Sequence, residues 1–456
     1  MRYRYTLGAA LLFVALLVWV LARERGRAPQ EGELFKLDVK QVTRLEVTPQ
    51  GGEPMALEKR GDQWWIASPF EGWADKDEAE RVARTLCELK PDKRPDEDPT
   101  RAQYGLDKPV LTARLWYDGN KKVEIALGAE TPVGSQLFAR IEGRKGLFLV
   151  SSVVKTDLSK KPEDLRDKKL AHYEKDDVEA VALQNARGTF EVKSRLVDGK
   201  KEWDLVQPVQ TKADRWSVDT LVNRPGEIEV KGFEKKPDKL AQFGLDKPSA
   251  KLTLHLASAK TVTILLGAKA KKTVKQQYGE GAEEQDIVYA MTEGRPELLM
   301  VEASLADDLD KDLMALRDKR ILAVDREKIR GLRVQRKKGL DFYVAKRAGE
   351  WFVDLPRPGK AKQTKVDDLL WNLEDLQTSE FIEKPEGIKQ YGLAVPQVVV
   401  TIETTDAGTT KVLFGDRTED SRFYCKVEDR DTVYVVSDLF VTSLPEKAED
   451  IEAGQE

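Results

Sequence analysis

The residues best suited to chemistry form an aspartate-rich run, DDLDKD, at Asp307–Asp312. Carboxylates at every second position open the calcium-binding loop of an EF-hand, but that loop also needs a glycine where this chain has Leu313. Leu309, Leu313 and Leu316 keep helical spacing instead. We therefore interpret the run as the solvated face of a helix, and we predict no metal site.

Other common catalytic groups are scarce. The chain has only two histidines, His172 and His255, and two cysteines, Cys87 and Cys425. The chain therefore has too few histidines and cysteines for a histidine-rich metal site and few candidates for a Ser-His or Cys-His nucleophile. The sequence has no Walker, HExxH, GxSxG or CxxC motif. We expect a protein that is not an enzyme, with no catalytic, cofactor-binding or metal-binding residues and no cofactor.

The two cysteines occupy different places in the repeat described below, so they form no evident disulfide framework. A pairing between them stays open.

The charges of the 76 basic and 80 acidic side chains nearly cancel, whereas nucleic-acid binding requires a clustered positive surface. We expect no nucleic-acid partner.

Three tryptophans are candidates for a sugar-stacking platform. Trp64, Trp203 and Trp351 open the stretches WWIASP, WDLVQP and WFVDLP, each with a proline five positions on. All three occupy the same strand position beside a turn, which is typical of a packing anchor. We favour that interpretation and keep ligand stacking as the alternative.

These tryptophans mark an internal repeat. A turn with the sequence QYGLDKP, QFGLDKP or QYGLAVP follows each one, and its aromatic residue (Tyr104, Phe243, Tyr391) lies at the same distance from the tryptophan in every copy. A glycine (Gly128, Gly267, Gly415) follows the aromatic residue, again at one fixed distance. The period is roughly 140 residues, so the repeated unit has the size of a domain.

Periodicity gives the fold class of each unit. Copy one has strand-like runs LTARLWYD, KKVEIALG, LFARIEG and GLFLVS after the turn. A helix is predicted before the turn, with apolar stripes at Ala79, Val82, Ala83, Leu86 and Leu89 in copy one and at Val366, Leu369, Leu370, Leu373 and Leu376 in copy three. In copy two Pro225 should end that helix early.

A second helix is predicted after the last strand, with Leu158 and Leu165 in copy one echoed by Leu309 and Leu316 in copy two. Each unit is therefore expected to be α+β, a mostly antiparallel sheet with packed helices. We predict copy one at 34–170, copy two at 171–321 and copy three at 322–456.

The repeated turn itself has two interpretations. A glycine loop that holds phosphate needs several glycines and a following helix. Here a short helix is predicted to end at Phe243, Gly244 to adopt the left-handed conformation, and Leu245 to fold back onto the last helical turn. We favour the helix cap.

Copy two differs from the others in one place. The interval from Gly267 to Tyr289 is more than twice as long as the matching intervals, Gly128 to Phe138 and Gly415 to Tyr424. The extra residues are basic first and acidic afterwards. They are expected to form a surface loop, either a tolerated insertion or a contact for a partner.

The N-terminus carries a membrane signal. Residues 5–22 are uncharged and mostly apolar, with Arg2 and Arg4 before them and three arginines after. As a helix this run measures about 27 Å, just enough for a bilayer core. We predict an uncleaved anchor at 1–27 and a linker at 28–33, with the remainder outside the cytoplasm; cleavage as a signal peptide is the alternative.

The combination of one N-terminal span, tandem units, a tryptophan strand and a YGL..P turn resembles the bacterial domain-of-unknown-function family 4340. The resemblance covers the chain after the anchor and rests on Trp64, Tyr104, Gly105, Leu106 and Pro109 with their two echoes. Phe243 replaces the tyrosine in copy two, and Ala394-Val395 replaces Asp-Lys in copy three.

The resemblance implies an accessory subunit at the membrane, because such proteins are often encoded beside ABC-transporter permeases and gliding-motility components. It implies no catalytic residues. We expect a single-pass protein of the bacterial inner membrane, periplasmic in bulk, that serves as a non-enzymatic scaffold for protein partners in a transporter or envelope complex. The alternative is a cell-wall or carbohydrate binding protein that uses exposed aromatic residues.

Overall fold

The computed structural model describes residues 37–453, except 95–97, 99, 101, 120, 133, 236–237, 276–281, 323 and 407. The predicted anchor and linker, residues 1–33, lie outside this range. Among the helices within it, none combines the length and apolar character required to cross a bilayer.

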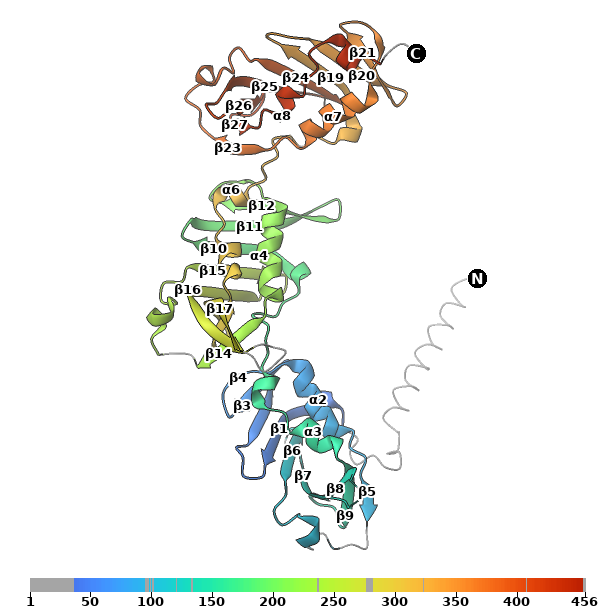
Figure 1. The fold of residues 1–456 in the computed structure, drawn as a ribbon, viewed down its shortest axis with the longest axis vertical. Helices are drawn as coiled ribbons and strands as arrows, with labels where there is room; N and C mark the ends of the chain where they lie inside the picture. The colour runs from blue at the N-terminus through green and yellow to red at the C-terminus, as the bar shows by residue number, and fades with distance from the viewer. Residues whose placement is uncertain are drawn as a thin grey trace, which may run out of the picture. The chain divides into compact units, whose positions relative to one another are not determined.

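Three antiparallel sheets dominate the described residues, and helices are few (Figure 1). The sheet of copy one comprises β1 (Val42–Pro49), β2 (Met55–Arg60), β3 (Gln63–Ser68), β4 (Gly72–Trp73), β5 (Asp92–Arg94), β6 (Leu111–Tyr117), β7 (Lys121–Glu130), β8 (Gln136–Ile141) and β9 (Leu147–Ser151). That of copy two comprises β10 (Val178–Asn185), β11 (Gly188–Val197), β12 (Lys200–Gln207), β13 (Thr211–Lys212), β14 (Val230–Lys235), β15 (Ala250–Leu256), β16 (Thr261–Lys275), β17 (Ala282–Thr292) and β18 (Glu297–Glu302). That of copy three comprises β19 (Ile329–Arg336), β20 (Phe342–Arg347), β21 (Glu350–Leu355), β22 (Gly359–Lys360), β23 (Thr378–Ile382), β24 (Val398–Thr404), β25 (Thr409–Arg417), β26 (Phe423–Val427) and β27 (Val433–Val436).

One strand order serves all three sheets. In copy one it is β4-β3-β2-β1-β6-β7-β8-β9-β5, and the other two sheets repeat it strand for strand. The first four strands form a meander, and the strand after the first long helix returns to the opposite edge. The sequence prediction of three homologous, mostly antiparallel units is confirmed.

The long helix of each copy follows from this strand order. It connects the two edge strands, β4 and β5 in copy one, so it must cross one face of the sheet. These helices are α2 (Lys76–Cys87), α4 (Arg215–Glu227) and α7 (Gln363–Glu374). The predicted apolar stripes of α2 and α7 are buried, although Leu89 and Leu376 lie just past the helix ends.

Two helix predictions were wrong. The first concerns Pro225, which does not end α4, because the helix continues to Glu227. A proline this near the C-terminus removes a single helical hydrogen bond, and the backbone bonding resumes where Ile228 N donates to Arg224 O at 3.0 Å.

The second concerns the helix predicted after the last strand, which is two short pieces in every copy. They are α3 (Val153–Leu158) and a 3₁₀ turn (Pro162–Leu165) in copy one, α5 (Ser304–Leu309) and α6 (Leu313–Leu316) in copy two, and α8 (Leu439–Thr442) and α9 (Ala448–Ile451) in copy three. In copy two the break falls inside the aspartate run, because Asp312 is extended and caps α6 through a bond from Ala315 N (2.7 Å). The predicted helix face therefore holds for Asp307 and Asp308, which lie in α5, and is wrong for Asp310 and Asp312, which lie in the break.

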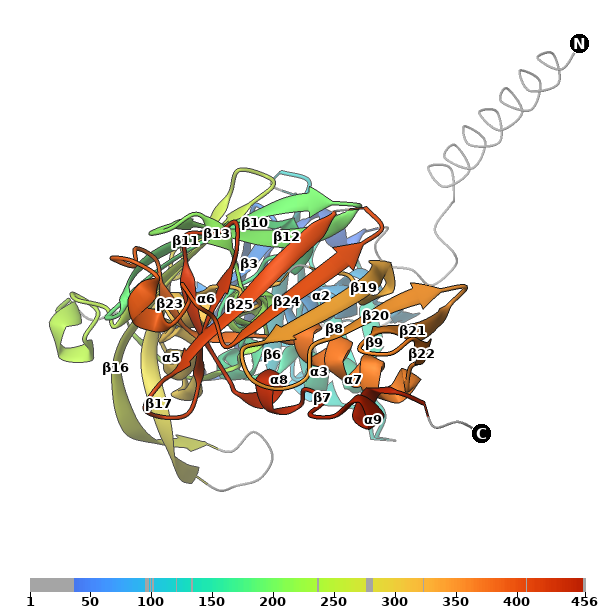
Figure 2. The ribbon, with the colours of Figure 1, turned by 90° about the horizontal axis from the view of Figure 1, so that it is seen from above.

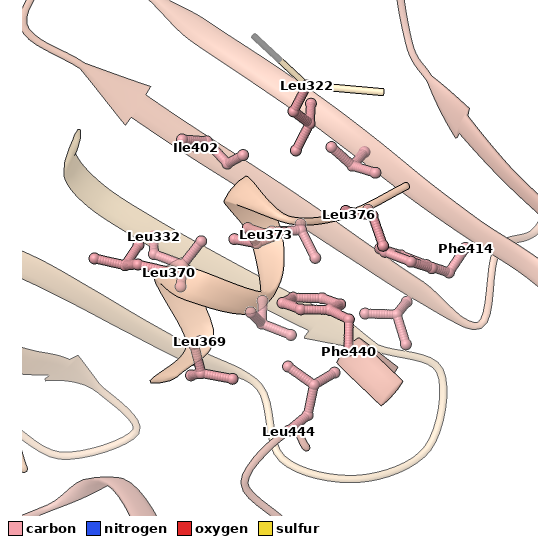
Figure 3. Close-up of a cluster of buried hydrophobic side chains, with 14 of the residues drawn as sticks. Leu322, Leu332, Leu369, Leu370, Leu373, Leu376, Ile402, Phe414, Phe440 and Leu444 are labelled. Atoms are coloured by element: carbon pink, nitrogen blue, oxygen red, sulfur yellow. The ribbon is translucent and has the colours of Figure 1, made fainter. Parts of the chain in front are cut away.

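The core of copy three illustrates how helix and sheet pack (Figure 3). Leu369, Leu370 and Leu373 of α7 point toward the sheet, and Phe440 of α8 stacks on Phe414 with ring centroids 5.3 Å apart. Figure 2 shows α7 and α8 on the same face of this sheet. Ile451 of α9 is fully buried in the same core.

By compactness the chain forms two units, which do not follow the repeats. The first comprises residues up to Asp177 together with Asn223–Leu309, and the second comprises Val178–Val222 with Asp310 onward. Copy two contributes β14–β18 to the first unit and β10–β13 to the second. The contacts described below each lie within one of these units.

The repeated turn is a helix cap, as predicted. Gly105, Gly244 and Gly392 have φ of 62°, 69° and 70°, in the left-handed region. In copy two Gly244 N donates to Ala241 O and Leu245 N donates to Leu240 O, both at 3.1 Å, which is the bonding of a Schellman-type cap.

The glycine that follows the turn at fixed spacing packs directly against it. A Cβ on Gly128, Gly267 or Gly415 would lie only 2.0 to 2.1 Å from the carbonyl oxygen of the turn's aromatic residue. The aromatic ring of the turn then contacts a second ring on the next strand, in the pairs Tyr104–Phe138, Phe243–Tyr289 and Tyr391–Tyr424, with centroids 4.6 to 4.9 Å apart. The repeated motif is therefore architectural.

The insertion of copy two is a strand ribbon and not a loop. β16 has 15 residues, against 10 in β7 and 9 in β25, and its basic half pairs with the acidic half of β17 (Figure 2). Lys271 lies opposite Asp286, with Nζ 3.8 Å from Oδ1. The opposite charges along the insertion stabilise its own hairpin. Its tip, residues 276–281, lies outside the described residues.

Candidate functional site

The three repeated tryptophans are packing anchors. Trp64, Trp203 and Trp351 are 0%, 6% and 3% exposed. The backbone carbonyl of each accepts a bond of 2.8 to 3.0 Å from the alanine that precedes the long helix. The proline that follows each tryptophan has a cis peptide bond in all three copies. These side chains are not available for sugar stacking.

The aspartate run is occupied by internal ion pairs. Asp308 pairs with Arg224 of α4 (2.7 Å) and Asp307 with Lys269 of β16 (2.7 Å). In the second unit Asp310 pairs with Arg187 (3.2 Å). Among the residues that the structure describes, no three histidine, cysteine or carboxylate side chains are grouped as metal ligands.

Both cysteines are free and buried. Burial raises the pKa of Cys87 to about 11 and raises that of Cys425 further still. A thiol that stays protonated is a poor nucleophile. The disulfide between them that the sequence left open is absent from the structure.

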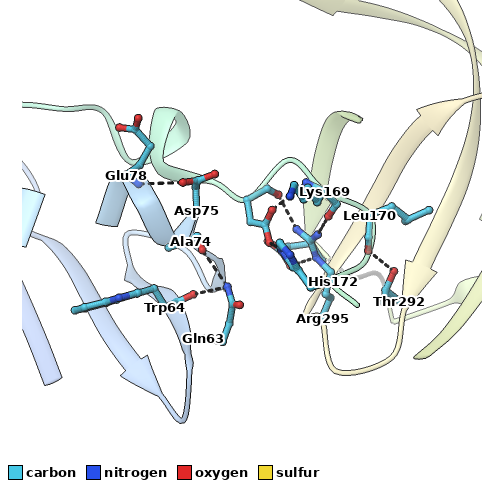
Figure 4. A network of polar contacts seen from close by, with 12 residues as sticks. Gln63, Trp64, Ala74, Asp75, Glu78, Lys169, Leu170, His172, Thr292 and Arg295 are labelled. Carbon is cyan, nitrogen blue, oxygen red and sulfur yellow. Dashed lines mark hydrogen bonds and ion pairs between the residues drawn. The ribbon is translucent and has the colours of Figure 1, made fainter. Parts of the chain in front are cut away.

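A buried cluster of charged groups surrounds residues 166–170, which lead out of copy one and are called here the first exit segment (Figure 4). Four buried or partly buried ionisable side chains meet there: Arg166, Asp167, Arg295 and Glu297. Glu297 lies 3.5 Å from Arg295 and 3.6 Å from Arg166, and its side chain is 3% exposed. Asp167 also contacts Nε2 of His172.

Burial decides the electrostatics of this cluster. It raises the pKa of Glu297 and lowers the pKa values of Arg295 and Arg166, because each charge has lost its hydration. The opposite charges partly offset that cost. Neither carboxylate oxygen of Glu297 has a hydrogen-bond donor within the described residues.

A histidine–aspartate contact near a carboxyl group of raised pKa has the parts of a general acid–base site. The surrounding space is filled by protein. Oε1 of Glu297 lies 2.3 Å from the position that a Cβ on Gly72 would take. The Arg166 guanidinium lies 3.6 Å from the ring centre of Phe70 and 4.7 Å from that of Phe233.

The hydrogen bonds of the cluster serve the backbone of the exit segment. Arg295 donates to the carbonyl oxygens of Asp167 (3.0 Å) and Lys169, and the Thr292 hydroxyl donates to Leu170 O (2.8 Å). Figure 4 shows Arg295 reaching across to this segment. The cluster therefore holds the end of copy one on β17 and β18, and we interpret it as a joint.

The second unit contains an equivalent joint around residues 317–321, the second exit segment. Arg430 donates to Ile321 O at 2.8 Å, and Arg317 lies 3.6 Å from the ring centre of Phe381 while pairing with Glu383. In copy three Glu452 occupies the position equivalent to Arg166 and Arg317, and it pairs with Arg357 at 3.0 Å.

The sequence predictions missed these arginines. A signal was present. Arg144, Arg295 and Arg430 precede the positions of Arg166, Arg317 and Glu452 at one fixed interval. A charged residue at fixed spacing within a repeat indicates a repeated contact, although the sequence alone does not give its partner.

The family model described as "Domain of unknown function (DUF4340)" matches three segments of the chain, residues 64–202, 203–382 and 351–454. No curated protein matches the sequence.

Proposed function

The chain belongs to the DUF4340 family, and from that premise we propose that it is a membrane-anchored, extracytoplasmic, non-enzymatic scaffold that contacts protein partners. The partners are subunits of an ABC-transporter-type or related complex of the bacterial envelope.

The observation that carries this proposal is where the repeated residues lie. The tryptophans, the turn glycines and their partner glycines are shared by all three copies, and all are used in packing. Several features that differ between copies are at the surface, such as the β16–β17 ribbon and the exposed Trp216 and Trp371. Repetition of a framework with variable surfaces suits a binding scaffold, because several weak contacts on one tether gain by effective concentration.

The anchoring part of the proposal is supported by the N-terminal sequence. Residues 5–22 have the length and character of a single membrane-spanning helix. The chain would be an inner-membrane protein with residues from about 30 onward in the periplasm. Protease added to spheroplasts should then digest copies one to three, and protection of these copies from the protease would overturn this topology.

A cell-wall or carbohydrate binding role is the second candidate. Trp216 is 79% exposed and Trp371 is 56% exposed, so aromatic surface is available. They are not equivalent in the repeat, however, and the three tryptophans that are equivalent are buried. A repeated sugar platform therefore has no support, and the scaffold is the better candidate.

A crosslinking pull-down from native membranes tests the scaffold proposal. The bait is the full-length protein, and the control is a variant without residues 1–27. Recovery of transporter subunits with the anchored form alone supports an accessory subunit. Recovery of glycan or wall fragments by both forms, without transporter subunits, would overturn the proposal in favour of the second candidate.

A further inference from the structure

A charged cavity of about 390 Å³ lies in the second unit, beside the second exit segment. Its walls come from the β12 end of the β11–β12 hairpin, from β13 and the start of α4, and from the exit segment with Gln377. The volume is within the range of small-ligand and side-chain pockets.

Backbone hydrogen bonds hold these walls together. Asp318 N donates to Lys212 O (3.0 Å), and Thr378 N donates to Lys319 O (2.8 Å). Isolated bridges pair Ala213 with Arg317 and Arg320 with Gln377. The exit segment is thus bonded on both sides, so the cavity is preformed, and a ligand would lose little ordering entropy on entering it.

The lining is electropositive. It contains six basic side chains, Lys200, Lys201, Lys212, Arg215, Lys319 and Arg320, and only three acidic ones, Glu202, Asp214 and Asp318. The carboxylates are already engaged: Glu202 by Arg195 (2.7 Å), Asp214 as the acceptor from Ser217 N (2.8 Å), and Asp318 by Arg320 (3.0 Å). Lys200 and Lys319 have no carboxylate within salt-bridge distance in the described part of the chain.

An exposed aromatic side chain borders this positive surface. Trp216 lines the cavity and has the highest exposed fraction of any large apolar side chain described, 79%. At the equivalent position of copy one stands Asp77. Trp73 of copy one occupies the position equivalent to Lys212 and packs on Arg295, with its ring centre 4.8 Å from the guanidinium carbon. The tryptophan of the first joint is thus half-buried against an arginine, whereas the second joint presents a tryptophan to solvent.

We propose that this cavity binds an acidic segment of a partner protein, with carboxylates on Lys200 and Lys319 and an apolar side chain on Trp216. The inference rests on the proposed scaffold function and specifies its partner's chemistry. Tryptophan and arginine are enriched at the centres of protein interfaces, and complementary charge steers the encounter.

The hydrogen-bonding groups favour a peptide over a sugar. A saccharide needs acceptors as well as donors for its hydroxyl groups. The three carboxylates are engaged as described, and the Gln377 side-chain nitrogen donates to Asp375 at 3.0 Å, so that the Gln377 side-chain oxygen is the one neutral side-chain acceptor in the lining. The other groups left over are cationic donors and an indole ring, which match carboxylates and an apolar group.

The test is a binding titration by fluorescence anisotropy with the full-length protein in detergent micelles. The probe is a fluorescein-labelled peptide of glutamates around a central leucine pair. Two further ligands serve as comparisons, the same peptide with glutamines in place of glutamates and an oligogalacturonate. The variants are Lys200→Glu with Lys319→Glu, and Trp216→Ala.

Matched controls come from the same unit. Lys384→Glu with Lys389→Glu makes the same charge change on exposed lysines outside the cavity, and Trp371→Ala removes another exposed tryptophan. We expect the glutamate peptide to bind and each cavity variant to weaken its binding about tenfold or more. The control variants should bind the glutamate peptide as the unmodified protein does, and the glutamine peptide should not bind.

Three results would overturn the proposal. They are no binding of the glutamate peptide, equal weakening by the control lysine pair, or binding of the oligogalacturonate in place of the peptide. The membrane pull-down separates this failure from failure of the scaffold function. If the cavity variants still recover the same partners from membranes, the scaffold stands and the cavity is not its contact.

Discussion

Gly415→Ala is the sharpest test of the architecture, because it places one methyl group against the repeated turn. A Cβ at this position would lie 2.1 Å from Tyr391 O and 3.0 Å from Cγ of Leu393. Normal contact between carbon and a carbonyl oxygen is about 3.3 Å or more, so the turn would have to move by more than about 1 Å. Leu393 is 2% exposed, so its pocket has little room to give.

The expected cost follows from this geometry. Overpacking a well-packed site costs about 1–3 kcal/mol, and here the obstacle is backbone and cannot change rotamer. Moving the turn also disturbs the contact between Tyr391 and Tyr424, whose ring centroids are 4.9 Å apart. We therefore expect Gly415→Ala to lower the unfolding free energy of copy three by an amount near the upper end of this range, about 3 kcal/mol.

Gly359→Ala is the matched control in the same copy. No atom lies within 4 Å of a Cβ there, and Gly359 does not have a positive φ. The change should be neutral within about 0.5 kcal/mol. Both substitutions replace glycine by alanine in a strand, so the difference between them reports the contact with the turn.

Native-state hydrogen exchange is the suitable assay, because a chain with three sheets need not unfold in one step. A loss of about 3 kcal/mol should speed exchange of the β24 and β25 amides by about 150-fold, and a loss of about 1 kcal/mol by about fivefold. Unchanged exchange in Gly415→Ala, or equal acceleration in Gly359→Ala, would refute the reasoning.

Three further predictions concern packing, the buried ions and the thiols. Trp351→Ala should destabilise copy three by about 3–5 kcal/mol, while the exposed Trp371→Ala should change it by less than about 0.5 kcal/mol, both measured by the same exchange experiment. Glu297→Ala removes the carboxylate that pairs with the buried Arg295 and the partly buried Arg166, and it should cost about 3–5 kcal/mol of unfolding free energy. Glu383→Ala, with a side chain 43% exposed, should cost less than about 1 kcal/mol; equal costs in urea unfolding would contradict a buried joint. Because burial raises the pKa of Cys87 from 9.0 to about 11, the unfolded chain loses that thiol proton first, so stability should fall as the pH rises from 9 to 11, by at most about 1.4 kcal/mol per pH unit. The variant Cys87→Ala should lack this part of the alkaline loss in urea titrations at each pH.

The two joints explain a feature that the repeat alone does not. Each exit segment crosses from one copy to the next and is fixed by backbone bonds on both sides. The arginines that clamp it, Arg295 and Arg430, belong to the copy that follows. A copy therefore depends on the next copy for hydrogen bonds to the backbone carbonyl oxygens at its own end. This dependence is typical of repeat proteins, in which stability is shared between units and interfaces.

The sequence by itself determined the copy number, the turn chemistry and the packing role of the tryptophans. These features depend on local rules: a glycine of positive φ ends a helix, and an apolar stripe at helical spacing is buried. The fixed spacings between tryptophan, turn and glycine indicated contacts that the structure places together, as for Tyr391 and Gly415.

Only the tertiary structure decided the rest. The end of α4 depended on how few hydrogen bonds Pro225 removes so near the helix terminus. The insertion of copy two forms a two-stranded ribbon because its basic half and its acidic half lie opposite one another on paired strands. The joint at Arg295 and Glu297 and the cavity at Trp216 join residues more than 100 positions apart. Their burial and charge balance arise from packing, which no local pattern in the sequence records.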